Sequence, residues 1–505
     1  MATTEVTGED AYEALLDRLE RVSAVESANG LLSWDQQVTM PEGGTPVRSK
    51  QRSVLSSLSH ELLTDEETAE LLDAARAADL TDEQRAVVRE ARREYERADA
   101  VPRELVEELS TASSEALGAW EEARAEDDFE TFAPHLERLV ELRRRQAEHI
   151  DPDRDPYAVL VEEYEPCLSI DRIDEILDRL RETLVPMIDE IAETGDEITT
   201  DAFDGTYPEA DQEALAEELL DVLGYDWERG RLDTSTHPFT SGNQFDCRVT
   251  VRYDESDPIE LWQAAVHEFG HAFYNLGLSQ DDWGTPLGTS RDLSVHESQS
   301  RLWENHVGMT EAFWERMLPT FNERFGTDVS PRAAYESANQ VYDDNLIRIE
   351  ADELTYHLHI VVRYEIEAAL VRGEIEVEDV PELWNDKYEE YLGIRPPTDS
   401  AGCLQDIHWS YGNFGYFPTY SLGSVMATQL FRAAERDLGD LTESIRAGEF
   451  GDLHEWLREN VHRHGQRYET NELVRQATGE EFSADAFVEY VREKYGALYG
   501  LESSV

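Results

Sequence analysis

Apolar residues recur at spacings of three and four along much of the first 230 positions of this chain. That periodicity predicts helices that bury one face. The longest such segments are residues 102–125, 130–149 and 171–194. Capping boxes, which open helices, are expected where Thr64 is followed by Glu67 and where Thr81 is followed by Gln84. About residues 1–230 are therefore predicted to form a helical array without obvious catalytic chemistry.

The period changes to two between Phe245 and Tyr253, where apolar and polar residues alternate strictly. This alternation predicts a half-buried strand. Together with the stretch 232–239, it predicts a small antiparallel β-sheet inside a helical protein. Helices resume after the sheet and are interrupted by a loop rich in Pro, Gly and aromatic residues between Gly393 and Pro418. The predicted fold class is therefore mostly α, with one small sheet.

Composition changes the picture chiefly through charge. Aspartate and glutamate number 111 against 44 lysines and arginines, for a formal net charge of −67. No basic stripe exists to displace counterions, so nucleic acid is excluded as a partner, and anionic membranes are disfavoured for the same reason. The only lysines are Lys50, Lys387 and Lys494. Dense carboxylates with so few lysines favour a halophilic protein over an ordinary acidic enzyme, because molar salt screens self-repulsion.

The compartment is predicted from what the sequence lacks. The amino-terminal residues have neither the basic nor the apolar region of a signal peptide, and no apolar run reaches the length of a membrane span. Three cysteines, Cys167, Cys247 and Cys403, cannot form a disulfide framework. We therefore expect a soluble cytoplasmic protein.

The candidate chemistry lies on the helix that follows the predicted strands. Asp257 and the proline after it are typical of a helix start. An apolar stripe on this helix is predicted to face the core: Trp262, Val266, Phe269, Phe273 and Leu276. His267 and His271 are four positions apart on another face, so both imidazoles can bind one metal ion. Glu268 lies beside that pair and can accept a proton from water and pass it to a leaving amine.

A catalytic zinc ion needs a third protein ligand and one open position for water. Glu297, which is 26 positions after His271, is the candidate. His296 is its competitor, since adjacent residues point in different directions and only one of them can face the metal. The absence of a third histidine in the metzincin spacing favours the glutamate, but spacing leaves both open. The alternative to a metal site is a structural helix in which the two histidines have no chemical role.

Three further polar groups have both a functional and a structural interpretation. Arg348 and Asp352 are one helical turn apart, and they form either a surface ion pair or an arginine fork that binds a substrate carboxylate. The segments 237–239 and 246–250 are expected on strands, which either hold an extended peptide or are purely structural. The aromatic loop around residues 405–420 either lines the site or simply packs.

These motifs, taken in their order along the chain, resemble the thermostable carboxypeptidase family, also called the carboxypeptidase Taq family, of metallopeptidases. The matching segments are Trp34-Asp35-Gln36, Met40-Pro41, His237-Pro238-Phe239, Asp-x-Arg-x-Thr at 246–250, His-Glu-x-x-His at 267–271, His296-Glu297-Ser298-Gln299, Ile-Arg-x-x-Ala-Asp at 347–352 and Gly-x-x-Gln-Asp-x-His-Trp at 402–409. Each segment is weak alone, and their joint order is highly specific.

The resemblance implies that His267, His271 and Glu297 are the ligands of one divalent metal, zinc in preference to cobalt, and that Glu268 is the general base. It also implies a helical fold with a deep active-site groove beside the sheet, a homodimer, and removal of single residues from peptide carboxyl termini with broad side-chain preference. We expect residues 1–505 to be a single unit, in which about 1–230 form one groove wall and about 231–505 the catalytic part.

By the same resemblance, four side chains are expected to contact the peptide substrate. Arg348 is expected to recognise its terminal carboxylate and Tyr420 to donate to the tetrahedral oxyanion, while His237 and His408 are expected on the substrate side. The rival enzyme is a related zinc endopeptidase that cuts inside short peptides. The rival from another class is a helical scaffold or binding protein with an inert histidine pair.

Overall fold

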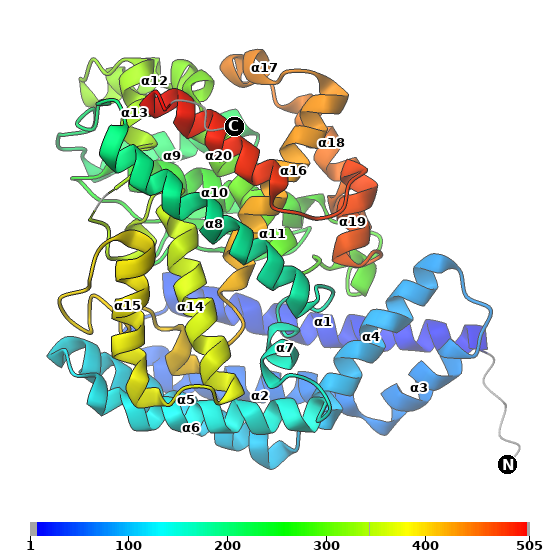
Figure 1. Ribbon diagram of the computed structural model, residues 1–505. Coiled ribbons are helices and arrows are strands. Elements are labelled where there is room, and N and C mark those ends of the chain that lie inside the picture. The colour runs from blue at the N-terminus through cyan, green and yellow to red at the C-terminus, as the bar shows by residue number, and fades with distance from the viewer. Residues whose placement is uncertain (1–7, 343, 502–505) are drawn as a thin grey trace, which may run out of the picture.

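The computed structural model describes residues 8–342 and 344–501, which form a mostly helical body (Figure 1). The helices of the first half are α1 Gly8–Val38, α2 Thr45–Thr64, α3 Glu66–Arg76, α4 Asp82–Ala100, α5 Arg103–Glu126, α6 Phe129–Ile150, α7 Pro156–Val161, α8 Ile170–Thr194 and α9 Glu209–Leu223. Those of the second half are α10 Pro258–Gly277, α11 Leu293–Trp303, α12 Glu311–Phe325, α13 Pro331–Ala338, α14 Thr355–Arg372, α15 Val380–Leu392, α16 Pro418–Leu438, α17 Thr442–Ala447, α18 Gly451–Asn460, α19 Thr470–Thr478 and α20 Asp485–Tyr499.

Short helical turns connect several of these elements. The 3₁₀ helices are η1 Glu42–Gly44, η2 Pro286–Gly288, η4 Arg348–Glu350, η5 Val377–Asp379, η6 His408–Tyr411 and η7 His462–His464. Directly after α11, the segment η3 Glu304–Gly308 is a π-helix. Across residues 8–342 and 344–501, no helix is both long and apolar enough to cross a membrane.

The mostly α prediction is confirmed. The amphipathic segments predicted at 102–125, 130–149 and 171–194 are α5, α6 and α8, with boundaries within one or two residues. The capping box of α4 is present, because Gln84 N donates to Thr81 Oγ1 (3.2 Å) and Thr81 N donates to Gln84 Oε1 (3.0 Å).

The capping box expected at Thr64 is wrong. Thr64 is the last residue of α2, and its hydroxyl donates back to the carbonyl of His60 (2.8 Å). The cap of α3 is Asp65, whose carboxylate accepts from Glu67 N (3.2 Å). Aspartate is as good an N-cap as threonine, so the start of the helix moves by one residue.

The sheet has three strands in the order β1-β3-β2, so β3 is central. The strands are β1 Gly230–Thr234, β2 Thr240–Gly242 and β3 Cys247–Val251. β2 pairs with β3 antiparallel, whereas β1 pairs with β3 parallel. The sheet is therefore mixed, and the prediction of a purely antiparallel sheet is wrong in this respect.

The direction of β1 follows from the segment that leaves it. Ser235 N donates to the carbonyl of Val251, and the Thr250 hydroxyl accepts from Phe239 N (2.9 Å). Residues 235–239 therefore pass the end of β3 and enter β2 on its other edge. The stretch 232–239 is not one strand, and His237 lies in this connection.

β3 and α10 bring the sheet and the candidate chemistry together. The two elements pack against each other, and Cys247, Val249 and Val251 are fully buried. Thr250 on the other face is buried as well, so β3 is more enclosed than a half-buried strand. The predicted stripe on α10 is confirmed, because all five of its apolar residues are buried. Asp257 caps α10 by accepting from Ile259 N (2.9 Å).

Buried apolar residues form one large core and two small ones. The large core extends from Ala116 to Tyr499 and includes α10, α11 and α16. A separate small core joins α1, α3 and α4, from Tyr12 to Ala91. In Figure 1, α3, α4 and one end of α1 project to one side of the body, and the α5–α6 pair crosses its base.

Candidate metal centre

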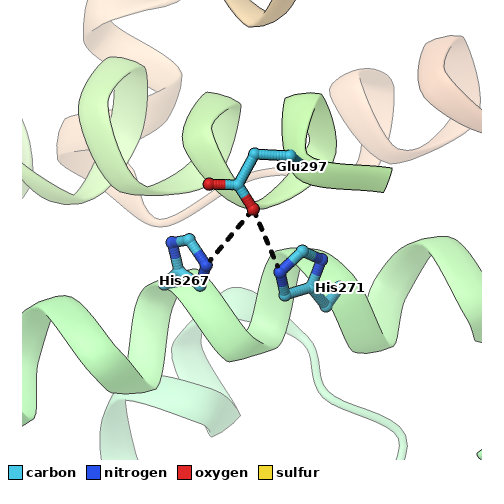
Figure 2. Close-up of side chains that lie close together, drawn as sticks. All are labelled: His267, His271 and Glu297. Carbon is cyan, nitrogen blue, oxygen red and sulfur yellow. Dashed lines mark ion pairs between the residues drawn. The ribbon is translucent and has the colours of Figure 1, made fainter. Parts of the chain in front are cut away.

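Two histidines of α10 face one glutamate of α11 (Figure 2). Nε2 of His267 is 3.7 Å from Oε2 of Glu297, and Nε2 of His271 is 3.4 Å from the same oxygen. One ligand atom from each residue lies within 4.8 Å of the other two. Among the described residues, this is the group of His, Cys, Asp and Glu side chains that could hold a metal ion.

Two glycines allow the helices to approach this closely. A Cβ on Gly270 of α10 would lie 2.5 Å from the carbonyl oxygen of Gln299 and from Cα of Ser300 on α11. A Cβ on Gly423 of α16 would lie 2.4 Å from Cγ of Glu297. Because real side chains do not fit at such distances, both positions require glycine for the observed packing. Glu297 is therefore fixed between α10 and α16.

Hydrogen bonds to the other ring nitrogens set the orientation of both imidazoles. Nδ1 of His267 is 2.7 Å from Oε2 of Glu304, and Nδ1 of His271 is 3.1 Å from the carbonyl oxygen of His296. Both acceptors require a proton on Nδ1, which leaves a lone pair on each Nε2. Since both Nε2 atoms point toward Glu297, the group fits a divalent metal with two nitrogen ligands and one oxygen ligand.

Arg301 connects the two carboxylates of the site. Its Nε donates to Oε1 of Glu297 (2.8 Å), and its Nη1 donates to Oε2 of Glu304 (3.2 Å). Burial opposes ionisation of Glu297, but the charge of Arg301 outweighs burial and holds the pKa of its carboxyl well below the usual range. The glutamate is therefore ionised, with Oε2 directed at the histidines.

The competitor His296 is directed elsewhere. Its Nε2 is 3.1 Å from Oδ1 of Asn275, and its Nδ1 is 2.6 Å from Nδ1 of His271. Burial, followed by the neighbouring His271, lowers the pKa of His296 to about 3, so the ring is neutral. Both ring nitrogens of His296 thus contact Asn275 and His271. His296 therefore holds the ring of His271 in place and is not a member of the ligand group.

Glu268 is buried on α10 and contacts the sheet. Its Oε2 is 2.6 Å from the hydroxyl of Thr240 on β2, and the same hydroxyl is 3.0 Å from the backbone carbonyl of Glu268. A hydroxyl has one proton, so it donates to one of these oxygens at a time. Thr240 thus ties the carboxylate of Glu268 to the edge strand beside the histidine pair.

Arg348 is a buried residue of η4, and its partner is Asp406. Nη2 and Nε of Arg348 both donate to Oδ1 of Asp406 (2.7 and 3.0 Å), and Nε of Arg363 donates to Oδ2 (2.6 Å). Burial opposes ionisation of Asp406, but the charges of Arg348 and Arg363 hold its pKa well below the usual range. Two guanidinium groups thus share one carboxylate, which leaves one positive charge in a buried cluster.

The suggested surface pair of Arg348 with Asp352 is wrong. Asp352 instead accepts from the backbone N–H groups of Leu354 and Thr355 (2.9 and 3.0 Å) at the start of α14. Such N-terminal N–H groups have no partner within their own helix, so a carboxylate there is structural.

Tyr356 joins this cluster to the metal ligands. Its hydroxyl accepts from Nη1 of Arg348 (3.1 Å), and the guanidinium of Arg301 lies 4.7 Å from its ring centroid. Tyr420, on the first turn of α16, has its ring 6.0 Å from that of Tyr356 and 5.3 Å from the guanidinium of Arg348. Arg348 and Tyr420 therefore belong to one connected site with Glu297.

His408 and His237 differ in their surroundings. His408 lies in η6, with Nδ1 3.7 Å from Oδ1 of Asp406. This nitrogen is buried and has no hydrogen-bond partner within the described part of the chain. Burial lowers the pKa of His408 to about 4, and the charge of Arg348 contributes in the same direction. The side chain of His237 is exposed, in the connection between β1 and β2.

Several residues of the site were not found from sequence. Arg301 is four positions after Glu297 on one helix, so its spacing could have revealed it. Glu304 lies in the π-helix η3, where ordinary helical spacing does not predict which way a side chain points. Thr240 and Asp406 reach their partners through contacts 28 and 58 positions apart, for which a single sequence carries no signal.

The helical body and the His-His-Glu group with an adjacent glutamate define a metallopeptidase of the His-Glu-x-x-His type. Residues 14–495 match the model of the carboxypeptidase Taq (M32) metallopeptidase family. Thermostable carboxypeptidase 1 of Thermus thermophilus is 41% identical to the chain, covering 98% of this chain and all of that protein. Carboxypeptidase 1 of Bacillus subtilis is 37% identical, covering 96% of this chain and 97% of that protein.

A solved structure has the same fold. The M32 carboxypeptidase of Deinococcus radiodurans superposes with a TM-score of 0.93 at 36% identity, covering 97% of this chain and all of that chain. The chain therefore belongs to the carboxypeptidase Taq (M32) family and is a metallocarboxypeptidase.

Proposed function

We propose that this metallocarboxypeptidase releases single residues from peptide carboxyl termini with broad preference, using one divalent metal held by His267, His271 and Glu297. The observation that carries the proposal is the convergence of three ligand atoms within 4.8 Å, on histidines whose Nδ1 atoms already have acceptors. Two imidazoles and a carboxylate form a set that zinc commonly occupies, so zinc is proposed ahead of cobalt.

Glu268 is the proposed general base and acid. When bound, the metal supplies Lewis-acid chemistry by lowering the pKa of water and polarising a carbonyl. Oε2 of Glu268 accepts the proton of the attacking water and later returns it to the departing amine. The Thr240 hydroxyl, 2.6 Å from that oxygen, restricts the rotation of the carboxylate.

The Arg348–Asp406–Arg363 cluster is the proposed site for the substrate's terminal carboxylate. Its one uncompensated positive charge, buried beside Tyr356, would be balanced by a peptide with a free carboxyl terminus. The unpartnered Nδ1 of His408 is proposed to contact the peptide, and the Tyr420 hydroxyl to donate to the oxyanion. His237 is proposed to meet the substrate from the exposed segment between β1 and β2.

Hydrolysis of one short peptide with free and with amidated carboxyl termini tests the proposal. We expect stepwise loss of terminal residues from the free peptide only, abolished by a chelator and restored by zinc or cobalt. Glu268→Gln should keep the metal and lose turnover. Internal cleavage of both peptides would instead establish an endopeptidase, and metal-independent cleavage would refute the metal centre.

A homodimer is also proposed, supported by an apolar stripe on α2. Val47, Val54 and Leu58 are 61%, 66% and 41% exposed, at spacings of seven and four along that helix. Such a stripe is stabilised when a partner covers it. Light scattering should give twice the mass of the chain, and Val54→Glu should halve it; a monomeric parent protein would contradict the dimer.

The excess of carboxylates supports a further proposal, that the protein works in a salty cytoplasm. Residues 1–505, with about 1–230 as one wall of a groove and about 231–505 as the catalytic part, are proposed to act there as a single unit. The extension of the large core from Ala116 to Tyr499, across this boundary, supports one unit.

A further inference from the structure

A cavity of about 680 Å³ lies where α3 and α4 meet the carboxyl end of α6 and the loop after it. Arginines dominate its lining. Five of them come from α4: Arg85, Arg89, Arg92, Arg93 and Arg97. Arg76 at the end of α3 and Arg154 before α7 add two more. The carboxylates in the lining are Glu96, Asp151 and Glu162, so arginines outnumber them.

This lining is opposite in sign to the rest of the molecule. The chain has a net charge of −67, with 44 lysines and arginines among 505 residues. Seven of the thirteen residues that line the cavity are arginines. Like charges that are brought together in a concave, partly desolvated site repel one another, so the arrangement costs free energy unless an anion balances it.

Nearby carboxylates compensate the arginines in part. Arg85 pairs with Asp82, and Arg92 pairs with Asp73 (2.7 Å) and Glu96 (3.5 Å), whereas other carboxylates are shared. Glu90 accepts from Arg89 (2.7 Å) and pairs with both Arg93 and Arg291 (3.2 Å each). In the same way, Glu162 pairs with Arg154 at 2.6 Å and Arg97 at 3.6 Å. Arg76 has no ion pair with any residue in the described part of the chain. Because Glu90 and Glu162 are divided among five arginines and Arg76 is unpaired there, the cavity wall keeps guanidinium groups that are not fully neutralised.

Two guanidinium donors inside the wall lack acceptors. Nε of Arg92 and Nε of Arg93 are buried and have no hydrogen-bond partner among residues 8–342 and 344–501. Buried donors are nearly always satisfied in folded proteins, so these two neighbouring donors are exceptions within the wall. Burial also lowers the pKa of Arg97, and the charges of Arg93 and Arg154 act in the same direction although Glu162 opposes them.

We propose that this cavity is a binding site for a phosphate-chain anion, such as a triphosphate group. Guanidinium forks bind phosphate oxygens in pairs, and a chain of linked phosphates presents enough oxygens for several arginines. The volume of the cavity is in the range of small-molecule sites. A long polyanion such as nucleic acid would have to continue over the acidic surface, so a compact ligand is favoured.

Calorimetric titration of the metal-loaded full chain with inorganic tripolyphosphate tests the site, at a potassium chloride concentration that keeps the protein folded. One saturable equivalent is expected. Arg92→Gln should weaken binding at least tenfold, and Arg76→Glu, which changes an exposed side chain, should do the same without risk to the fold. Arg103→Gln, on an exposed face of α5 outside the cavity, is the matched control and should leave the affinity unchanged.

Tripolyphosphate also chelates metals and could take the metal from the protein. The arginine variants leave the metal centre intact, so chelation contributes equally to every titration, and a difference between parent and variants reports on the cavity. Equal affinity in the parent protein, Arg92→Gln and Arg76→Glu, or no saturable binding, would overturn the proposal. Parallel titration with ATP distinguishes the sources: similar affinity indicates recognition of the phosphate chain alone, and at least tenfold tighter ATP binding indicates a nucleotide. Light scattering of the arginine variants covers a further outcome. If the parent protein binds no triphosphate and the variants lose a dimer that the parent forms, the proposal is overturned, and the cavity is instead a contact between two copies of the chain.

Discussion

A Cβ on Gly270 of α10 would lie 2.5 Å from Cα of Ser300 on α11, so the two helices meet there backbone to backbone. Gly270 is the residue before His271, and Ser300 is one helical turn after Glu297. The contact therefore sets the separation between the helix that carries the histidines and the helix that carries the glutamate.

Gly270→Ala is expected to move α11 away from α10 and weaken metal binding at least tenfold. Because the atoms in the way are backbone, the strain cannot be relieved by a side-chain rotation, and the free energy of unfolding should fall by about 1–3 kcal/mol. Gly118→Ala on α5, where a Cβ meets nothing within 4 Å, is the control and should be neutral or stabilising. A zinc titration with a competing chelator and thermal unfolding measure both effects; unchanged zinc affinity would contradict the packing argument.

Glu304→Gln is expected to weaken metal binding roughly 10–100-fold while the protein stays folded. Glu304 accepts from Nδ1 of His267 at 2.7 Å and from Arg301, so its charge fixes the tautomer of the ring that presents Nε2. The measurement is the zinc dissociation constant, which reports on positioning without relying on turnover. Glu311→Gln, at the partly exposed start of α12, is the control. Zinc affinity equal to that of the parent protein would remove the role of Glu304.

The sequence predicts the parts of this site that depend on local order along the chain. The cap at Asp257, the buried stripe of α10 and the His267–His271 pair follow from helical periodicity, and the structure has the first two as expected. Spacing could not decide between His296 and Glu297, because that choice depends on how α11 packs against α10 at Gly270.

Contacts between distant segments explain the errors. β1 is parallel to β3 because residues 235–239 cross the end of β3, and nothing in the alternation of residues encodes that crossing. Spacing along the chain suggests Asp352 as the partner of Arg348, whereas its partner in the structure, Asp406, is 58 positions away. A period identifies an element and its buried face, but it does not specify which elements meet.

Arg348→Ala is expected to lower kcat/KM for peptides with a free carboxyl terminus by about 10²–10³-fold, equivalent to roughly 3–4 kcal/mol. Without Arg348, the Asp406–Arg363 pair is neutral and offers no net charge to a carboxylate. Activity on amidated peptides should change far less, and the exposed Arg395→Ala should change neither. Paired assays on the two peptide forms measure the ratio. Equal losses on both would show that the residue supports the fold and does not recognise the carboxylate.

Removal of salt is expected to unfold the protein. At a net charge of −67, self-repulsion is screened over about 3 Å in 1 M salt but over about 10 Å in 0.1 M salt. The melting temperature should therefore fall by tens of degrees as potassium chloride is diluted from molar to 0.1 M. Circular dichroism during a thermal ramp at each concentration follows this change. A melting temperature independent of salt would assign the protein to ordinary acidic enzymes.

Acid destabilisation should depend measurably on His306. This buried ring of η3 stacks on Phe431 with centroids 5.0 Å apart, and its Nε2 is 3.0 Å from the hydroxyl of Thr428. Burial lowers its pKa to about 3; Lys494 and Arg432 act in the same direction, and Glu353 opposes them. The unfolded chain, with an ordinary histidine pKa near 6.5, therefore binds a proton first, so stability is lost as the pH falls below about 6.5.

His306→Gln removes this titration and is expected to narrow the gap in unfolding free energy between parent and variant by about 2 kcal/mol from pH 7.5 to pH 5. Denaturant unfolding at the two pH values measures that gap. Other buried groups have the opposite pH dependence; burial raises the pKa of Glu367 to about 7, for example. Such groups are present in both proteins, so their contributions cancel in the difference between parent and variant. Val307→Ala, a buried change that does not titrate, should keep a constant gap. A constant gap for His306→Gln as well would mean that the ring binds its proton equally in the folded and unfolded chain.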